Sequence, residues 1–83
     1  MKLKYFAWVR ERIGVPEEEV ALPADVATAG DLIRWLKTRG EGYAHALEND
    51  RFIRVAIDQR HVRHDAPLRD AREVALFPPM TGG

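Results

Sequence analysis

The segment Thr28-Ala-Gly-Asp-Leu-Ile-Arg-Trp-Leu36 predicts the main helix of this chain. Thr28 followed three residues later by Asp31 is a helix N-cap signature, because each side chain can satisfy a free backbone N–H of the first turn. An apolar stripe at helical spacing follows, made of Ala29, Leu32, Ile33 and Leu36. Gly40 marks its expected end. Such a stripe needs an apolar surface to pack against, and the flanking segments supply one.

Two strands are expected before this helix. Residues 2–8 alternate, with the odd-numbered residues on one face and Phe6 and Trp8 on the other, which is typical of a half-buried strand. Val9 and Ile13 are spaced i, i+4, and Gly14 follows, so a short helical turn is expected to end there. Residues 17–22 form the second predicted strand, polar at first, with its last apolar residues pointing inward.

Three more strands are expected after the helix and a second, shorter helical piece at residues 43–47. Residues 52–57 alternate, Asp58-Gln59 suits a turn, and residues 60–63 form a short return strand. Residues 73–77 are the last predicted strand, with Val74 and Leu76 pointing inward.

The resulting order of β, β, α, β, short β, β predicts an α+β fold, a mixed sheet with the main helix packed on one face. The β-grasp, or ubiquitin-like, roll has this order and places the first and last strands side by side and parallel at the sheet centre. We expect residues 1–83 to form one such domain, with residues 78–83 as an extended C-terminal tail.

Composition excludes several classes of function. Thirteen Lys and Arg balance thirteen Asp and Glu, and both halves of the chain are balanced as well. A nucleic-acid binder or a membrane anchor needs a concentrated basic face, so neither is expected. Cys is absent, which excludes disulfides and thiolate sites. No signal peptide or long apolar run is present, and a cytoplasmic location is expected.

The rest of the sequence contains no recognisable set of catalytic or metal-binding residues. His61, His64 and Asp65 lack a converging third ligand partner at suitable spacing, so no metal site is expected. Residues 17–19 are three glutamates, which we interpret as the solvated edge of a sheet. Trp35 lies beside the helical stripe and is expected to pack there. Nucleophile and phosphate-binding motifs are absent, and the chain is not expected to be an enzyme by itself.

The last residues, Phe77-Pro-Pro-Met-Thr-Gly-Gly83, carry the clearest functional pattern. Pro78 and Pro79 cannot continue a β-ladder and favour an extended conformation, so they would project the tail away from the domain. From Pro79 the chain extends at most about 17 Å. Gly82 and Gly83 have no side chain and fit a channel too narrow for a Cβ. The group at the tip is the α-carboxylate of Gly83, a poor electrophile until it is activated.

The chain resembles the small subunit of molybdopterin synthase, a family of ubiquitin-like sulfur carriers. The residues that match the family are Phe6 to Glu11 and Gly14, Thr28, Leu32 and Leu36 in the helix, Ile57-Asp58-Gln59, Pro67-Leu68-x-Asp70, and the ending from Phe77 to Gly83. The ending is the specific part. Two positions depart from the family: Ala71-Arg72 replace a frequent Gly-Asp, which questions the turn geometry there, and His61 replaces an apolar residue.

The resemblance implies a reaction in which the Gly83 carboxylate is adenylated by an E1-like enzyme with ATP. A sulfur donor enzyme then converts the glycyl-adenylate to a thiocarboxylate, a C-terminal 1-thioglycine, and no cofactor is bound. The tail, Pro78 through Thr81 with Met80 and the two glycines, inserts into the large synthase subunit. There the sulfur attacks cyclic pyranopterin monophosphate, towards the dithiolene that binds molybdenum or tungsten. The small subunit is a sulfur-donating co-substrate, without turnover of its own.

Other functions stay open at this point. Carriers for thiazole or for tRNA thiolation also end in Gly-Gly, a ubiquitin-like modifier would join Gly83 to lysines, and a plain interaction module would not use the tail.

The alternation of side chains along the strands also predicts a docking face for a partner protein. If the first and last strands are neighbours, Phe6, Trp8 and Phe77 lie on the open face of the sheet beside the tail, with His61 at the rim.

Overall fold

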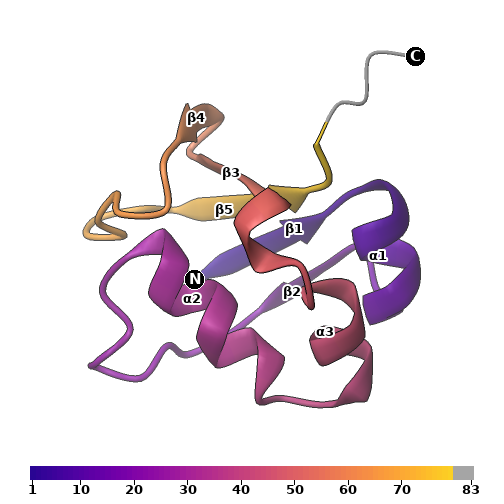
Figure 1. The fold of residues 1–83 in the computed structure, drawn as a ribbon. Coiled ribbons are helices and arrows are strands. Elements are labelled where there is room, and N and C mark those ends of the chain that lie inside the picture. Colours follow the sequence, from indigo (N-terminus) through magenta and orange to yellow (C-terminus); the bar gives the residue numbers. More distant parts are fainter. Residues whose placement is uncertain (80–83) are drawn as a thin grey trace.

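The structure, a computed structural model, describes residues 1–79 and consists of a five-stranded mixed sheet with helices against it (Figure 1). The spatial order of the strands is β2-β1-β5-β3-β4. In chain order the elements are β1 (Lys2–Tyr5), α1 (Ala7–Ile13), β2 (Glu17–Glu19), α2 (Ala29–Lys37), α3 (Glu41–Ala46), the 3₁₀ helix η1 (Asp50–Phe52), β3 (Arg54–Ile57), β4 (Arg60–Val62) and β5 (Glu73–Phe77).

The first and last strands lie side by side and parallel at the centre of the sheet, as predicted. Leu3 pairs with Val74 and Tyr5 with Leu76. The other edge of β5 pairs antiparallel with β3. The apolar parity of residues 73–77 is confirmed, because Val74 and Leu76 are fully buried under the helices. The strand that leads into the tail therefore has a neighbour on both sides.

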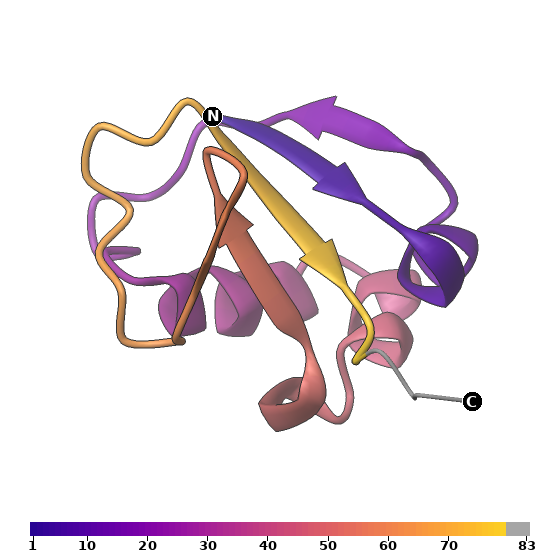
Figure 2. The ribbon, with the colours of Figure 1, turned by 90° about the horizontal axis from the view of Figure 1, so that it is seen from above.

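The main helix forms as its sequence predicts and covers one face of the sheet (Figure 2). Thr28 Oγ1 accepts the Asp31 N–H at 3.1 Å, and Asp31 Oδ2 accepts the Thr28 N–H at 3.1 Å, which completes the capping box. The helical stripe joins a single core of fully or almost fully buried apolar side chains. Its members include Leu3, Tyr5, Val9, Leu32, Ile33, Leu36, Leu47, Ile53, Val55, Val74 and Leu76.

The first strand is shorter than the alternation of residues 2–8 predicts. β1 ends at Tyr5, Phe6 is still extended (φ −130°, ψ 155°), and Ala7 at φ 53° turns the chain into α1. The predicted stop of the short helix is confirmed, since Gly14 has φ 102° and donates its N–H to the Arg10 carbonyl. Because the helix begins two residues before Val9, the strand parity assumed for Trp8 is wrong.

Other boundaries shift while the elements remain. β2 is limited to Glu17–Glu19, although Val20 still donates its N–H to the Met1 carbonyl at 2.9 Å. β3 begins at Arg54 because η1 takes up Phe52, while Ile53 is buried as predicted.

Two turns in the second half of the chain, at residues 58–59 and 70–71, determine how β4 and β5 begin. Asp58 and Gln59 have φ 49° and 72°, which makes the predicted turn between β3 and β4 a tight hairpin turn. Asp58 Oδ1 also accepts the N–H groups of Arg72 and Glu73, which fixes the start of β5. Ala71 stands where the family often has glycine, which raises the question whether a positive φ is needed there. The residue with the positive φ in this turn is Asp70 (64°). Ala71 is therefore not strained.

The sheet order, the parallel central pair and the helices on one face confirm the β-grasp prediction, an α+β roll. The helices in residues 1–79 are all too short or too polar to span a lipid bilayer.

Gly42→Ala is expected to destabilise the fold by about 1–3 kcal/mol, because α3 packs closely on α1 at this position. A Cβ on Gly42 would approach the Arg12 carbonyl oxygen to 2.8 Å, a backbone atom that cannot swing away. Gly40→Ala is the matched control, since its Cβ would meet only the Tyr43 ring edge at 3.7 Å. Urea denaturation of both variants measures the difference; equal midpoints would contradict the close approach.

Candidate functional site

The tail leaves the domain at the end of the sheet where β1 and β5 both terminate. β5 ends at Phe77, and Pro78 and Pro79 follow it half-buried and outside any helix or strand. Because proline lacks an N–H, the ladder to β1 and β3 stops there. Figure 1 shows this segment turning away from the side of the sheet that carries α2 and α3. The predicted functional residues Met80, Thr81, Gly82 and Gly83 lie outside the described residues.

Phe6 and Phe77 flank this exit on the open face of the sheet. The Phe6 N–H donates to the Leu76 carbonyl at 3.2 Å, so Phe6 continues the register of β1 beside β5. Phe6 is 45% exposed, and Phe77 is half-buried. Both point opposite to their buried strand neighbours, Tyr5 and Leu76, as the parity argument requires.

His61 joins this surface from the far edge of the sheet. Its ring centroid lies 5.1 Å from that of Phe77, with the ring planes inclined at 59°. His61 pairs with Ala56 on β3, and Ala56 pairs with Ala75 on β5, so two small side chains form the floor between the larger ones. We call Phe6, Ala56, His61, Ala75 and Phe77 the open-face patch.

Trp8, which was also expected on this face, lies on α1. Its side chain packs partly against the core, and the Arg12 guanidinium carbon lies 4.5 Å from the centroid of its ring. Its assignment to the docking face loses its basis because β1 ends three residues earlier.

The part of the open face formed by β1, β2 and the start of β5 is charged, and its charges are paired with one another. Lys2 Nζ lies 3.1 Å from a Glu17 carboxylate oxygen, Lys4 Nζ lies 3.5 Å from Glu73, and the terminal amine lies 3.2 Å from Glu19. These exposed pairs contribute little stability. They make the open face charged and hydrated over β1, β2 and the start of β5, whereas the open-face patch lies at the other end, next to the tail exit.

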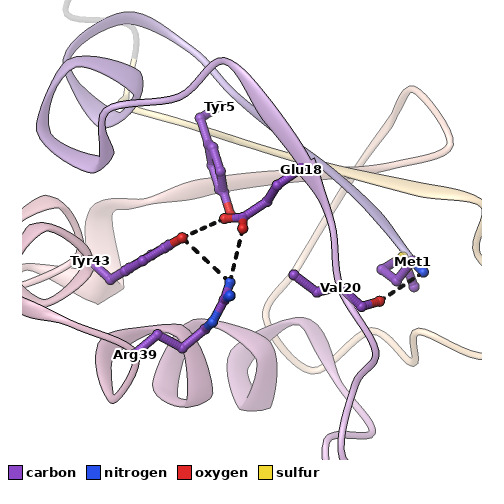
Figure 3. A network of polar contacts seen from close by, with 6 residues as sticks. All are labelled: Met1, Tyr5, Glu18, Val20, Arg39 and Tyr43. Atoms are coloured by element: carbon purple, nitrogen blue, oxygen red, sulfur yellow. Dashed lines mark hydrogen bonds and ion pairs between the residues drawn. The ribbon is translucent and has the colours of Figure 1, made fainter.

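The interpretation of all three glutamates as solvated is wrong for Glu18. Tyr5 and Tyr43 each donate a hydroxyl to Glu18 Oε2 at 2.7 Å, and Arg39 Nη1 donates to Oε1 at 3.1 Å (Figure 3). Glu18 has the inward parity of Val20, a signal that the run of identical residues obscured. The network ties β1 and β2 to Arg39, between α2 and α3, and to Tyr43 in α3. Trp35 packs beside it under the Arg39 guanidinium.

Desolvation raises the pKa of Glu18, but the hydrogen bonds from Tyr43, Tyr5 and Arg39 outweigh it, so the pKa lies below its ordinary value. Burial, followed by the hydrogen bond to Glu18, raises the pKa of both tyrosines. The hydroxyls therefore stay protonated as donors, and the carboxylate stays ionised, throughout the neutral range.

Glu18→Gln is expected to lower the free energy of unfolding at pH 7 by about 1–3 kcal/mol, because charge-assisted hydrogen bonds are weakened. A depressed folded-state pKa stabilises the fold above the ordinary glutamate pKa, and this contribution is lost as the pH falls through the folded value. The wild type should therefore lose stability more steeply than Glu18→Gln below about pH 4.3. Glu19→Gln is the control, since its side chain is 76% exposed. Parallel pH profiles of all three proteins in urea unfolding would contradict this role.

The two histidines once considered as metal ligands contact different groups. His61 lies against Phe77, whereas His64 Nε2 lies 2.7 Å from the Ile53 carbonyl oxygen. Within the part of the chain that the structure describes, no three His, Cys, Asp or Glu side chains are placed to hold a metal ion.

Comparison with known proteins places the chain in a family. The model of the ThiS family matches residues 3–83. The molybdopterin synthase sulfur carrier subunit of Escherichia coli K12 is 41% identical over 83 residues, covering 100% of this chain and 99% of that protein. The same subunit of Haemophilus influenzae is 36% identical, with the same coverage. The crystal structure of the Haloferax volcanii small archaeal modifier protein 1 is 27% identical, with a TM-score of 0.70, covering 95% of each chain.

The fold defines a β-grasp protein whose last strand, β5, lies at the centre of the sheet and leads into the C-terminal segment. The chain belongs to the ThiS family, and its resemblance to the small subunits of molybdopterin synthase is confirmed.

Proposed function

We propose that this chain is the sulfur carrier subunit of a molybdopterin synthase in the cytoplasm. The observation that carries the proposal is full-length similarity, at 41% identity, to a protein of that name. The geometry at the end of β5 supports it. A central strand with a neighbour on each side holds the base of the tail, and Pro78-Pro79 directs it out beside the open-face patch.

In this proposal the Gly83 carboxylate is the reacting group. A carboxylate oxygen attacks the α-phosphate of ATP on an E1-like adenylating enzyme and releases pyrophosphate. A donor enzyme then delivers sulfur at the oxidation level of sulfide. This sulfide attacks the acyl carbon of the adenylate, the acyl–phosphate bond breaks with release of AMP, and a thiocarboxylate is left. In the large synthase subunit, the thiocarboxylate sulfur is transferred to cyclic pyranopterin monophosphate, and water restores the Gly83 carboxylate.

In this proposal the residues of this chain position the tail in the active site of the partner, and none of them acts as an acid or a base. Phe6, Phe77 and His61 form a docking contact next to the base of the tail. Docking there fixes where Pro79 starts, so a tail of about 17 Å reaches one defined point in the partner. Gly82 and Gly83 add no side chains and thread the last part of the path.

The purified chain is expected to show no conversion of pyranopterin by itself, even in its thiocarboxylate form. Dithiolene product should appear only when the large subunit is added, in an amount limited by the thiocarboxylate supplied. Product formation by the small subunit alone would contradict the assignment of catalysis to the partner. Failure of the thiocarboxylated chain to support any product with the large subunit would overturn the proposed function.

A second candidate function is that of a ubiquitin-like modifier. It is favoured by the likeness to a solved structure named small archaeal modifier protein 1, at 27% identity. In that case Gly83 forms an amide with lysines of other proteins. Mass spectrometry of proteins from the source cells distinguishes the two, because conjugation leaves the tail of this chain on target lysines.

A further inference from the structure

Arginine side chains and one histidine gather along the β3–β4 side of the sheet, next to the tail exit. Arg54 and Arg63 line two neighbouring surface hollows of about 500 Å³ and about 350 Å³. His61 lines the larger hollow, and Arg51 lines the smaller one. All four side chains are exposed. We call Arg51, Arg54, His61 and Arg63 the basic strip.

The arginines of the strip lack acidic partners among residues 1–79. Of the ten arginines of the chain, Arg34 and Arg39 alone form ion pairs within that range, with Asp31 and Glu18. Arg51, Arg54 and Arg63 are set apart from the other unpaired arginines because they lie together at the two hollows. Asp65 also lines the larger hollow and is a lone acid facing these cations. Because the whole chain has a formal net charge of zero, this strip is a local excess of positive charge.

The hollows between these cations have an apolar floor. Val55, Val62 and Ala66 line the larger hollow, and Ile53 with Val62 lines the smaller one. β4 is an edge strand, so no further strand of the sheet lies beyond it. An apolar floor between guanidinium groups suits a polypeptide that carries both acidic and apolar side chains. A nucleic-acid backbone would need a denser row of cations.

The strip is continuous with the open-face patch. Arg54 pairs with Phe77 across β3 and β5, and the His61 ring contacts the Phe77 ring. A partner that docks on Phe77 therefore has its neighbouring surface directly over Arg54.

We propose that the basic strip binds an acidic polypeptide segment of a partner protein, as a charged contact beside the apolar contact at Phe6 and Phe77. Complementary charge at this position would speed the encounter and fix the rotation of the domain on its partner. The strip would bind such a segment whichever reaction the tail serves.

The test is an NMR titration of the ¹⁵N-labelled full chain with a capped hexaglutamate peptide, with capped hexaglutamine as the neutral control. We expect saturable shifts confined to residues 51–66 with hexaglutamate, decreasing with added salt. Hexaglutamine should produce none. Shifts spread over all arginines, or shifts of equal size with both peptides, would overturn the proposal.

Two charge-reversed variants sharpen the result. Arg54→Glu/Arg63→Glu should weaken hexaglutamate binding by about tenfold or more. Arg10→Glu/Arg69→Glu, two exposed arginines outside the strip, changes the net charge equally and should leave binding in residues 51–66 nearly unchanged. Equal losses in both variants, at unchanged melting temperatures, would refute a specific strip. A hexathymidylate oligonucleotide that binds the strip more tightly than hexaglutamate would also overturn the proposal in favour of a nucleic acid.

Discussion

Deletion of Gly83 is expected to abolish sulfur transfer while leaving the free energy of unfolding unchanged. In the proposed function this residue carries the reacting carboxylate, and shortening the tail moves that group away from both active sites by about 3.4 Å. The core lies within residues 3–76 and the sheet pairing of β5 ends at Phe77, so we expect folding to be independent of Gly83. Intact-mass spectrometry after loading, together with urea denaturation, measures both effects.

Two further variants test separately whether the terminal carboxylate must lie at residue 83 and whether the tail must be free of side chains. A chain extended beyond Gly83 should be neither adenylated nor thiocarboxylated, because its carboxylate is displaced. Gly82→Ala should reduce transfer without loss of stability, since a methyl group clashes only within a narrow channel of the partner. Ordinary sulfur transfer by the Gly83-deleted protein would exclude the carrier function, although the fold would be unaffected.

Phe77→Ala is expected to weaken binding to the large synthase subunit by about 2 kcal/mol or more, which is roughly thirtyfold in affinity. The side chain lies on the open face, contacts His61 and stands immediately before the tail, where a partner that receives the tail must approach. Titration calorimetry with the large subunit gives the affinity, and thermal unfolding of the variant gives its stability.

Phe77→Leu serves as the graded control, because it keeps part of the apolar contact and should lose less affinity. A large drop in melting temperature for Phe77→Ala, with unchanged affinity, would show that Phe77 stabilises the fold and does not bind the partner. The docking contact would then have to be sought elsewhere on the open face.

Sequence patterns predicted those elements in which one local signal dominates. Thr28 and Asp31 fix the start of α2, and the alternation around Val74 and Leu76 gives both the last strand and its inward face. The position of Phe77 beside Phe6 then follows from parity and from the parallel pairing of β1 with β5.

The errors have equally local causes. The alternation of side chains continues through Trp8 in the sequence, but the positive φ of Ala7 ends the strand before it. A positive φ is uncommon at alanine, so the sequence gives no sign of it. Glu18 looks like its two neighbours, and its role depends on Tyr43 and Arg39, which come more than twenty residues later. The basic strip likewise arises only when β3, β4 and η1 are brought together by folding.

The placement of β5 has a consequence for synthesis of the protein. The strand made last among those described occupies the centre of the sheet, between β1 and β3, which come from earlier parts of the chain. A nascent chain that stops before residue 73 leaves the edges of both neighbours unpaired and the apolar side of α2 uncovered. Folding is therefore completed only when the ribosome has released the segment next to the tail. In the proposed function, a chain without β5 would lack Phe77 and its contact with His61, so it would not present the docking contact needed for sulfur loading.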